Sequence, residues 1–176
     1  MEIDIRQATL DVLAAWWDDQ IAKNPTDYSV KAYKGIFVTR NQSGNYKTFY
    51  AFDGGKIVGQ ATLILRPSGL SGDKKFHGNG NAEINKLEVE PQYQGNGIAG
   101  KLIRRLENWS RANGVHTLTI GVEQSETRNR EIYKHWGYTD FVGETVEAYE
   151  PAAKDGKSET IVVLWYAKSI GILDEN

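Results

Sequence analysis

The sequence predicts one domain of the mixed α/β (α+β) class, with elements in the order β-α-α-β-β-β-α-β-α-β-β. Residues 81–114 read as a strand, a glycine-rich turn and an amphipathic helix. Residues 46–52 and 56–65 read as two strands joined by Asp53-Gly54-Gly55, which is a strong signal for an antiparallel hairpin. The chain of 176 residues is long enough for one hydrophobic core and no linker divides it, so we expect residues 1–176 to form a single domain.

The N-terminal part is predicted to contain a strand and two helices. Alternating isoleucines indicate a strand over residues 2–8, and Thr9 can cap the helix that follows. Asn24-Pro25 ends that helix, and a second helix is expected from Thr26 to Phe37. Four large aromatic side chains of this region are expected to pack in the core, with the alternative that some of them line a binding pocket: Trp16, Trp17, Tyr28 and Tyr33.

The C-terminal part is predicted to contain strands and one further helix. His116 to Val122 alternates as a half-buried strand does, and a polar helix is expected from Glu126 to Trp136 before Gly137 ends it. The apolar run from Thr160 to Ala167 is typical of a buried strand. Three segments are predicted to be loops or a frayed end: 67–81, 154–158 and 171–176.

The central stretch carries the clearest sign of a binding site. From Ile98 to Trp109 the apolar residues recur at helical spacing, so they gather on one side of the helix. Gly95 and Gly97 lie at the start of this helix, where the absence of side chains lets backbone N–H groups approach a ligand. Because the N-terminus is the positive end of the helix dipole, this arrangement predicts an anion site of the kind that binds phosphate.

The strand before this turn is predicted to contain an irregularity. Ala82 and Ile84 have even numbers, whereas Leu87 and Val89 have odd ones. If one face of the strand is buried throughout, one extra residue must lie near Asn85-Lys86, which is what a β-bulge provides. The alternative is a regular strand that has apolar residues on both of its faces, which would give the same pattern without a bulge.

The composition argues against several classes of function. There is no cysteine, so disulfides, thiolate metal sites and a cysteine nucleophile are ruled out. The three histidines are far apart in the sequence, and we expect no metal site. A net charge of −2 gives no basic face for nucleic acid, and the chain shows neither a signal-peptide pattern nor an apolar run long enough for a membrane. We therefore expect a cytoplasmic protein without a nucleic-acid or membrane partner.

The glycine-rich turn resembles the signature Gln/Arg-x-x-Gly-x-Gly/Ala of the GNAT superfamily of acyl-CoA-dependent N-acetyltransferases, because it reads Gln94-Gly95-Asn96-Gly97-Ile98-Ala99. Leu87 to Tyr93 is similar to the strand and proline that precede this signature. Ile132 to Tyr138 is similar to the family's Tyr-x-x-x-Gly-Phe segment, with Tyr138 in place of Phe. The resemblance implies a mixed, mostly antiparallel central sheet of about seven strands flanked by about four helices, with a bulged central strand.

The resemblance also implies a reaction and its donor. The reaction is transfer of an acetyl group from acetyl-CoA to a primary amine, of a small molecule or a protein, by direct attack in a ternary complex. The turn amides would hold the CoA pyrophosphate, and the bulged strand would pair with the pantetheine arm and polarise the thioester carbonyl. A homodimer is also implied, since family members often form one. The implied CoA-binding residues are Leu87, Glu88, Val89, Gln94, Gly95, Asn96, Gly97, Ile98, Ala99 and Asn129.

Asn129 departs from the family pattern. The family usually has an asparagine seven residues before the tyrosine of the second segment, and this chain has Glu126 at that position. Asn129 lies one turn later on the predicted helix. It is therefore the candidate for the contact that the family's asparagine makes with the pantetheine arm.

The chemistry requires groups that move protons. A primary alkylamine has a pKa of about 10.4, so removing its proton at neutral pH costs about 4–5 kcal/mol. Glu83 stands where many family members carry an acid and is the candidate that accepts this proton, directly or through water; Glu88 and Glu123 are the alternatives. Tyr133 matches the family tyrosine that protonates the departing thiolate, and a phenol with a pKa of about 10 is protonated at neutral pH. A tyrosine packed in the core is the alternative for that position.

Three other interpretations compete with the acetyltransferase hypothesis. Gly95 to Gly100 also fits the dinucleotide fingerprint G-x-G-x-x-G, but that fingerprint needs a buried strand running directly into the first glycine, and Glu90 to Gln94 intervene here. A binding module that holds acyl-CoA without turning it over would keep the turn and could dispense with Tyr133. A purely structural domain would have no reason for paired glycines at a helix start.

Overall fold

The computed structural model describes residues 2–65, 80–149 and 159–171. The order of elements is the predicted one, with a short 3₁₀ turn, η2, added before the central helix. The predicted loops at 67–81 and 154–158 and the chain end at 171–176 fall almost entirely outside the described residues. The elements are β1 (Ile3–Gln7), α1 (Leu10–Lys23), α2 (Tyr28–Gln42), β2 (Tyr46–Asp53), β3 (Lys56–Ile64), β4 (Asn81–Val89), η2 (Pro91–Tyr93), α3 (Ile98–Ala112), β5 (Thr117–Glu123), α4 (Thr127–His135), β6 (Asp140–Tyr149) and β7 (Glu159–Ser169).

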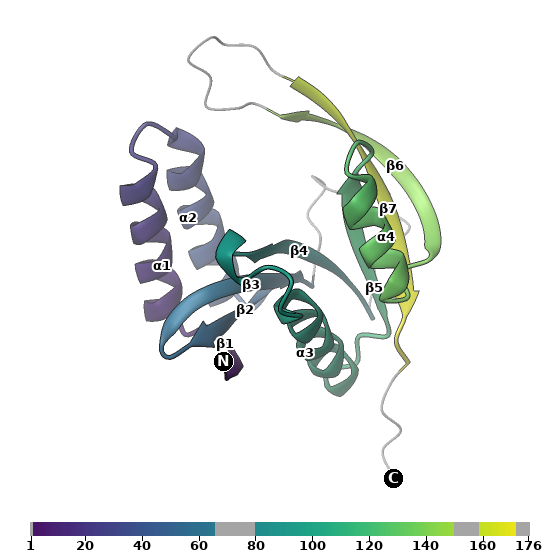
Figure 1. The fold of residues 1–176 in the computed structure, drawn as a ribbon, viewed down its shortest axis with the longest axis horizontal. Coiled ribbons are helices and arrows are strands. Elements are labelled where there is room, and N and C mark those ends of the chain that lie inside the picture. The colour runs from purple at the N-terminus through teal and green to yellow at the C-terminus, as the bar shows by residue number, and fades with distance from the viewer. Residues whose placement is uncertain (1, 66–79, 150–158, 172–176) are drawn as a thin grey trace.

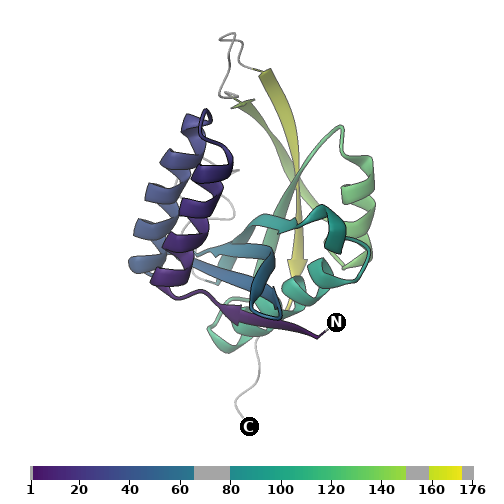
Figure 2. The same ribbon diagram turned by 60° about the vertical axis from the view of Figure 1, so that its left-hand side comes forward.

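The described strands form one seven-stranded sheet in the order β1-β2-β3-β4-β5-β7-β6. Its neighbouring strands are antiparallel except β4 and β5, which are parallel. Helices α1 and α2 cover one face, and α3 and α4 lie on the other (Figures 1 and 2). The mixed, mostly antiparallel architecture is therefore confirmed. No helix in the described ranges is long and apolar enough to cross a membrane.

Both N-terminal helices begin at side-chain caps. The Thr9 hydroxyl accepts the Val12 N–H at 3.4 Å, and the Asp27 carboxylate accepts the Ser29 N–H at 2.9 Å, so each cap satisfies an N–H that has no partner within its helix. Helix α2 continues to Gln42 instead of ending at Phe37. Its last turn is anchored to β2, because the Asn41 amide accepts the Thr48 N–H at 3.1 Å.

The expectation for the large aromatics is only partly correct. Trp17 is 3% exposed and belongs to the core under α1 and α2, and Trp16 is half-buried beside it. Tyr33 is more exposed than a core residue, at 38%, and the expectation is wrong for Tyr28, which is 76% exposed. Tyr28 is the first residue of α2 and lies on its solvent side, with the Lys31 ammonium 5.7 Å from its ring centre.

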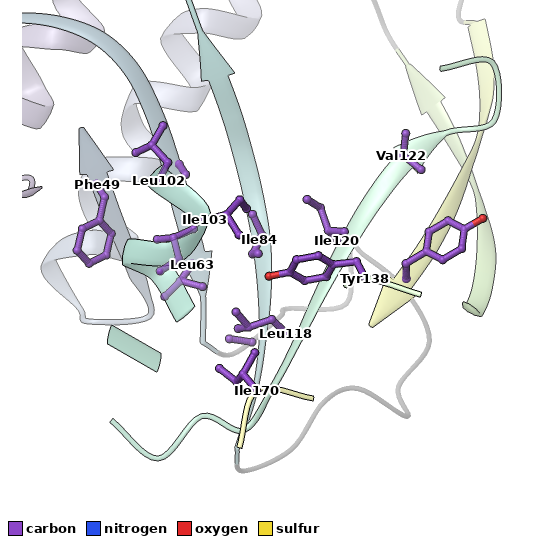
Figure 3. Close-up of a cluster of buried hydrophobic side chains, with 14 of the residues drawn as sticks. Phe49, Leu63, Ile84, Leu102, Ile103, Leu118, Ile120, Val122, Tyr138 and Ile170 are labelled. Atoms are coloured by element: carbon purple, nitrogen blue, oxygen red, sulfur yellow. The ribbon is translucent and has the colours of Figure 1, made fainter. Parts of the chain in front are cut away.

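Two apolar layers, one on each face, hold the sheet. Alternation along β2 sends Phe49 and Ala51 into the main core beneath α3, and Tyr50 and Phe52 into the layer beneath α1 and α2. Helix α3 contributes its predicted apolar stripe, and burial of each such side chain stabilises the fold by about 1.5–3 kcal/mol. Figure 3 shows that the main core includes side chains from both β4 and β5. The buried apolar residues of the stripe are Ile98, Leu102, Ile103 and Leu106.

Strand β4 contains the predicted bulge. Gln60 of β3 lies opposite Glu88, and Thr62 lies opposite Asn85, so two β4 residues face a single β3 residue. The extra residue explains why even-numbered and odd-numbered residues face the same side of the sheet. All four pack against the main core: Ala82, Ile84, Leu87 and Val89. Lys86 at the bulge has φ of 51°, and among the described residues it is the only one other than glycine with positive φ.

Beyond the bulge the two parallel strands separate. Pairing between β4 and β5 ends at Ile84 and Ile120. From there β4 stays paired with β3 as far as Val89, whereas β5 stays paired with β7 as far as Glu123. In Figure 1 β4 turns toward α1 and α2 while β5 rises beside α4. The sheet therefore opens at its centre.

Candidate active site

A cleft of about 570 Å³ lies where β4 and β5 separate. Its lining includes residues on both sides of the bulge in β4 and the last residues of β5. Residues of α2 and α4 also line the cleft, and so do residues of β6 and β7. The cleft therefore connects the α1–α2 face of the sheet with the face that carries α3 and α4.

The glycine turn lies where β4 leads into α3. Gly95 and Gly97 have φ of 79° and 73°, a conformation that glycine adopts without the strain of a side chain. A Cβ atom at either position would meet nothing within 4 Å, so their outer side is open. Gly97 is the N-cap of α3, and the first N–H groups of a helix have no partner within the helix. The turn is thus shaped to present N–H groups to an anion.

Two amide side chains hold the turn, one bonded to the end of β4 and the other to η2. The Gln94 amide donates to Val89 O at 3.0 Å, and the Asn96 amide donates to Tyr93 O at 3.1 Å. Ile98 is 1% exposed in the main core, so only its backbone can contact a ligand. Side chains of the turn therefore shape it, and backbone groups face outward.

Val89 places a backbone N–H on the open edge of β4. Glu90 donates its own N–H to Val58 O at 2.9 Å, which lies in β3. Because successive N–H groups of a strand point to opposite edges, the N–H of Val89 points away from β3. That edge faces β5, from which β4 has already separated. Val89 does not line the cleft, whereas Leu87 does, so the amide expected to be free in the stretch Leu87–Val89 stays a prediction for this part of β4.

Tyr133 lines the cleft from α4. Its ring lies 5.9 Å from that of Trp136 and packs against the edge of the main core. Burial is the main cause that raises the pKa of Tyr133 to about 12, and the nearby negative charge of Glu126 adds to the shift. The hydroxyl is therefore protonated throughout the neutral pH range.

The three candidate acids occupy different environments along the cleft. Glu83 is 3% exposed, and the Asn85 amide donates to its carboxylate at 3.3 Å. Glu88 is exposed at the bulge and accepts the Gln60 amide at 2.7 Å and the Lys86 ammonium at 3.4 Å. Glu123 lies at the end of β5 within hydrogen-bond distance, 3.5 Å, of the Ser125 hydroxyl. All three line the cleft, and Glu83 is the one that is withdrawn from solvent.

Asn129 is hydrogen-bonded to Glu126, the residue at the position of the family's asparagine. Its amide donates to the Glu126 carboxylate at 2.6 Å. Glu126 lines the cleft, whereas Asn129 is one turn further along α4 and is not among the lining residues. The structure thus brings together Glu83, Leu87, Glu88 and Tyr133 in one cleft, with the glycine turn as a separate neighbouring feature.

Several cleft residues are not recognisable from the sequence. Lys86 places its ammonium 4.9 Å from the Tyr33 ring centre, and the break in parity at Asn85-Lys86 was the signal that could have singled it out. Glu147 and Trp165 come from the C-terminal hairpin, and no spacing in the sequence relates them to the glycine turn. Their contribution depends on the pairing of β5 with β7, which places the hairpin beside the cleft.

The topology argues against the dinucleotide-binding alternative. That fold requires a mostly parallel sheet with a strand that runs directly into the glycines. Here a single parallel pair lies in an otherwise antiparallel sheet, and the 3₁₀ turn Pro91–Tyr93 separates β4 from Gly95.

This chain is similar to a curated protein and to several solved structures. A [ribosomal protein bS18]-alanine N-acetyltransferase of Haemophilus ducreyi is 31% identical over 83 residues, which are 47% of this chain and 55% of that protein. The chain thus spans about half the length of this curated relative.

Solved structures show the same fold at lower identity. The ribosomal-protein-S18-alanine N-acetyltransferase of Escherichia coli superposes with a TM-score of 0.64 at 22% identity, covering 99% of this chain and 98% of the other. An acetyltransferase from Salmonella typhimurium, solved with its cofactor acetyl-CoA, gives 0.66 at 18% identity over 100% and 96% of the two chains.

The model of one protein family, the acetyltransferase (GNAT) family, matches residues 10–138. That range includes α1, the bulged strand, the glycine turn and Tyr133. The chain therefore belongs to the acetyltransferase (GNAT) family.

Proposed function

We propose that this protein is an N-acetyltransferase that moves an acetyl group from acetyl-CoA to a primary amine by direct attack within a ternary complex. One observation carries the proposal: β4, which leads to the glycine turn, parts from β5, and Glu83 and Tyr133 line the cleft that opens between the two strands. An elongated donor can lie in such an opening while an amine approaches from the other face of the sheet.

The chain's residues fit acetyl-CoA at its charged end. The open sides of Gly95 and Gly97 leave room for a pyrophosphate against the first N–H groups of α3. The helix dipole adds a favourable interaction with negative charge, typically about 0.3–1 kcal/mol. Any side chain at Gly97 would occupy the space that this group needs.

The bulged strand supplies the groups for the acyl end of the donor. A backbone N–H of β4 in the stretch Leu87–Val89, where β4 has left β5, would donate a hydrogen bond to the thioester carbonyl oxygen. The amine nitrogen then forms a bond to the carbonyl carbon, and the carbon–sulfur bond breaks with its electron pair leaving on sulfur. The proton that the amine loses would pass to Glu83, directly or through water.

Tyr133 would return a proton to the leaving sulfur. Its pKa of about 12 keeps the hydroxyl protonated, so a hydrogen-bond donor is present at neutral pH. The same value makes full transfer of the proton to a free thiolate unfavourable, since a thiol has a pKa of about 8.5. We therefore assign to Tyr133 a hydrogen bond that stabilises the negative charge developing on sulfur, and any proton that it gives to the thiolate must be replaced from solvent so that no phenolate is left.

The test is thiol release from acetyl-CoA in the presence of single amines, with the acetylated product identified by mass spectrometry. The panel includes a simple alkylamine and, because the relatives act on an alanine of a ribosomal protein, a peptide that begins with alanine. We expect thiol release that depends on the amine, with one acetyl group added per thiol. Binding of acetyl-CoA without amine-dependent release by any acceptor would show an acyl-CoA-binding module instead.

A further inference from the structure

A second tyrosine lines the cleft from the face of the sheet opposite to Tyr133. Tyr46 is the first residue of β2 and packs against the apolar layer beneath α1 and α2. Tyr133 packs against the main core, on the face that carries α3 and α4. Both residues line the cleft. The proposed reaction gives a role to Tyr133 and none yet to Tyr46.

Strand register places Tyr46 and Glu83 in one row across the sheet. Tyr46 of β2 lies opposite Ile64 of β3, and Ile64 lies opposite Glu83 of β4. Residues directly opposite each other share a face, so all three side chains point toward α1 and α2. The neighbours of Glu83 agree with this, because Ala82 and Ile84 pack in the main core on the other face. Strands are spaced by about 4.8 Å, which sets the Cα atoms of Tyr46 and Glu83 about 10 Å apart, a gap that a tyrosine side chain can largely cross.

The ring of Tyr46 is held by packing beside the cleft. Its centre lies 5.3 Å from that of the Phe37 ring in an edge-to-face contact, and Phe37 is 4% exposed. Tyr46 itself is half-buried. A ring held in this way has few rotamers open to it, so its hydroxyl loses little conformational entropy when it forms a hydrogen bond.

The Tyr46 hydroxyl stays protonated, and the charge of Glu83 acts on it. Burial is the main cause that raises the pKa of Tyr46 above its ordinary value. The positive charge of Arg40 lowers this pKa, and the negative charge of Glu83 raises it. The phenol is therefore uncharged at neutral pH and can both donate and accept a hydrogen bond. Such a group can orient a water molecule beside a carboxylate without taking the proton itself.

Two threonine hydroxyls also lie on this face near Glu83, but neither residue lines the cleft. Thr119 of β5 is opposite Glu83, and its hydroxyl donates to a backbone carbonyl at 3.4 Å. Thr62 of β3 is fully buried, and its hydroxyl lies 2.9 Å from that of Thr48. Within the described part of β2 to β5, Tyr46 is therefore the hydroxyl-bearing residue that lines the cleft.

We propose that Tyr46 is a positioning residue on the acceptor side, whose hydroxyl holds the water through which the reacting ammonium passes a proton to Glu83. This inference rests on the proposed function and adds a residue to its first proton transfer. One N–H bond of the ammonium breaks and its proton goes to the water, while the water gives one of its own protons to a carboxylate oxygen of Glu83. The electron pair left on nitrogen then attacks the carbonyl carbon. Tyr46 keeps its proton throughout.

The first test removes the hydroxyl and compares two acceptors of similar shape, ethylamine and 2,2,2-trifluoroethylamine. Ethylamine is almost wholly protonated at neutral pH, since an alkylamine has a pKa of about 10.4. The fluorines withdraw electrons, so trifluoroethylamine is mostly neutral and has no proton to lose before it attacks. In Tyr46→Phe we expect kcat/KM to fall at least about tenfold for ethylamine and to stay within about threefold for trifluoroethylamine. The same change for both acceptors, or no change for either, would overturn the proposal.

Tyr50→Phe is the matched control for the loss of a phenol from this strand. Tyr50 is on β2 and in the same apolar layer, but it is fully buried and does not line the cleft. The ratio of kcat/KM for the two amines should stay at the wild-type value in this variant. A ratio that changes as much in Tyr50→Phe as in Tyr46→Phe would contradict the assignment of Tyr46.

A measurement without substrate keeps this inference separate from the proposed function. Carbon-13 NMR of the tyrosine rings follows the titration of Tyr46 in the folded wild type and in Glu83→Gln. Loss of the carboxylate charge should lower the pKa of Tyr46, whereas the pKa of Tyr133, which is influenced by Glu126, should not change. An unchanged Tyr46 pKa would overturn the inference even if amines are acetylated. Absence of thiol release with every acceptor would instead overturn the proposed function, and the relay with it.

Discussion

At the scale of single residues, Tyr133 links packing to chemistry. Its ring is part of the contact between α4 and the main core, and the residue also lines the cleft. Burial raises its pKa to about 12, which makes the phenol a persistent hydrogen-bond donor. The two roles can be separated, because replacement by phenylalanine keeps the ring and removes only the hydroxyl.

Tyr133→Phe should therefore lower kcat by about 10²-fold, the usual contribution of a positioned general acid. The dissociation constant for acetyl-CoA should stay within a few-fold, since no group of the glycine turn changes. Tyr50→Phe is a suitable control, because Tyr50 is fully buried and does not line the cleft. Its hydroxyl has no hydrogen-bond partner among the described residues, so its removal breaks no bond. An unchanged single-turnover rate in Tyr133→Phe would leave Tyr133 as a packing residue.

The raised pKa of Tyr133 also predicts a dependence of stability on pH. Below about pH 10 the phenol is protonated in both the folded and the unfolded chain. Between about pH 10 and pH 12 the unfolded chain loses this proton first, because the pKa in the fold is about 12, and the folded state loses up to about 2–3 kcal/mol. Urea denaturation at rising pH should show a smaller loss of unfolding free energy in Tyr133→Phe than in the wild type. Parallel curves for the two proteins would mean that the phenol is not desolvated.

The residues that could be predicted from the sequence are those whose role is fixed by neighbours in the chain. Gly95 and Gly97 are recognisable because a strand precedes them and a helix follows. Tyr133 is recognisable from its spacing to Gly137, although its place in the cleft depends on how α4 packs on β5. Glu147 belongs to the opposite case, since it reaches the cleft only through the pairing of β6 with β7 and of β7 with β5.

At the scale of elements, the bulge in β4 determines where the sheet opens. Its presence followed from the parity of four apolar residues, which is a local signal. The separation of β4 from β5 did not follow, because it depends on how β5 pairs with β7. The end of α2 was also missed, since the helix is prolonged by a bond between Asn41 and β2 that is formed only in the folded chain.

Lys86 provides a direct test of the bulge. Its φ of 51° lies in the left-handed region, which glycine adopts readily and alanine does not. Lys86→Gly should therefore be more stable than Lys86→Ala by about 1 kcal/mol, opposite to the usual order in a strand. Both variants lack the contacts with Glu88 and Tyr33, so the comparison isolates the backbone. A more stable alanine variant in urea denaturation would contradict the bulge geometry.

At the scale of the whole molecule, the opening of the sheet requires something to hold its two parts together. A cluster of hydrogen-bonded side chains around the buried Glu107 links the two parts. Glu107 of α3 accepts the Lys168 ammonium of β7 at 2.7 Å and the Tyr138 hydroxyl, which follows α4, at 3.1 Å. Lys168 also donates to Trp136 O at 2.7 Å. Helix α3 is thereby tied to the β5–β7–β6 side of the sheet.

Glu107→Ala should lower the unfolding free energy by about 2–4 kcal/mol, because it leaves the Lys168 ammonium without its carboxylate in a mostly buried site. Glu131→Ala is the control: it removes an ion pair of similar length with Lys134, at 3.2 Å, but that pair is exposed and should change stability by less than about 1 kcal/mol. Thermal or urea denaturation compares the two. Equal small losses in both variants would show that the cluster does not join the two parts of the sheet.

The glycine turn at the start of α3 is proposed to hold the charged end of acetyl-CoA, and the rest of the mechanism depends on a donor anchored there. Calorimetric titration of acetyl-CoA into wild type, Gly97→Glu and Gly114→Glu tests it with a control from the other end of the same helix. Gly97 and Gly114 have φ of 73° and 74°, and a Cβ at either would meet nothing within 4 Å, so the two substitutions impose the same backbone strain. In the folded variants we expect the dissociation constant to rise at least about tenfold for Gly97→Glu, or 1.4 kcal/mol, and to stay at the wild-type value for Gly114→Glu. Wild-type affinity in a folded Gly97→Glu variant would contradict the claim.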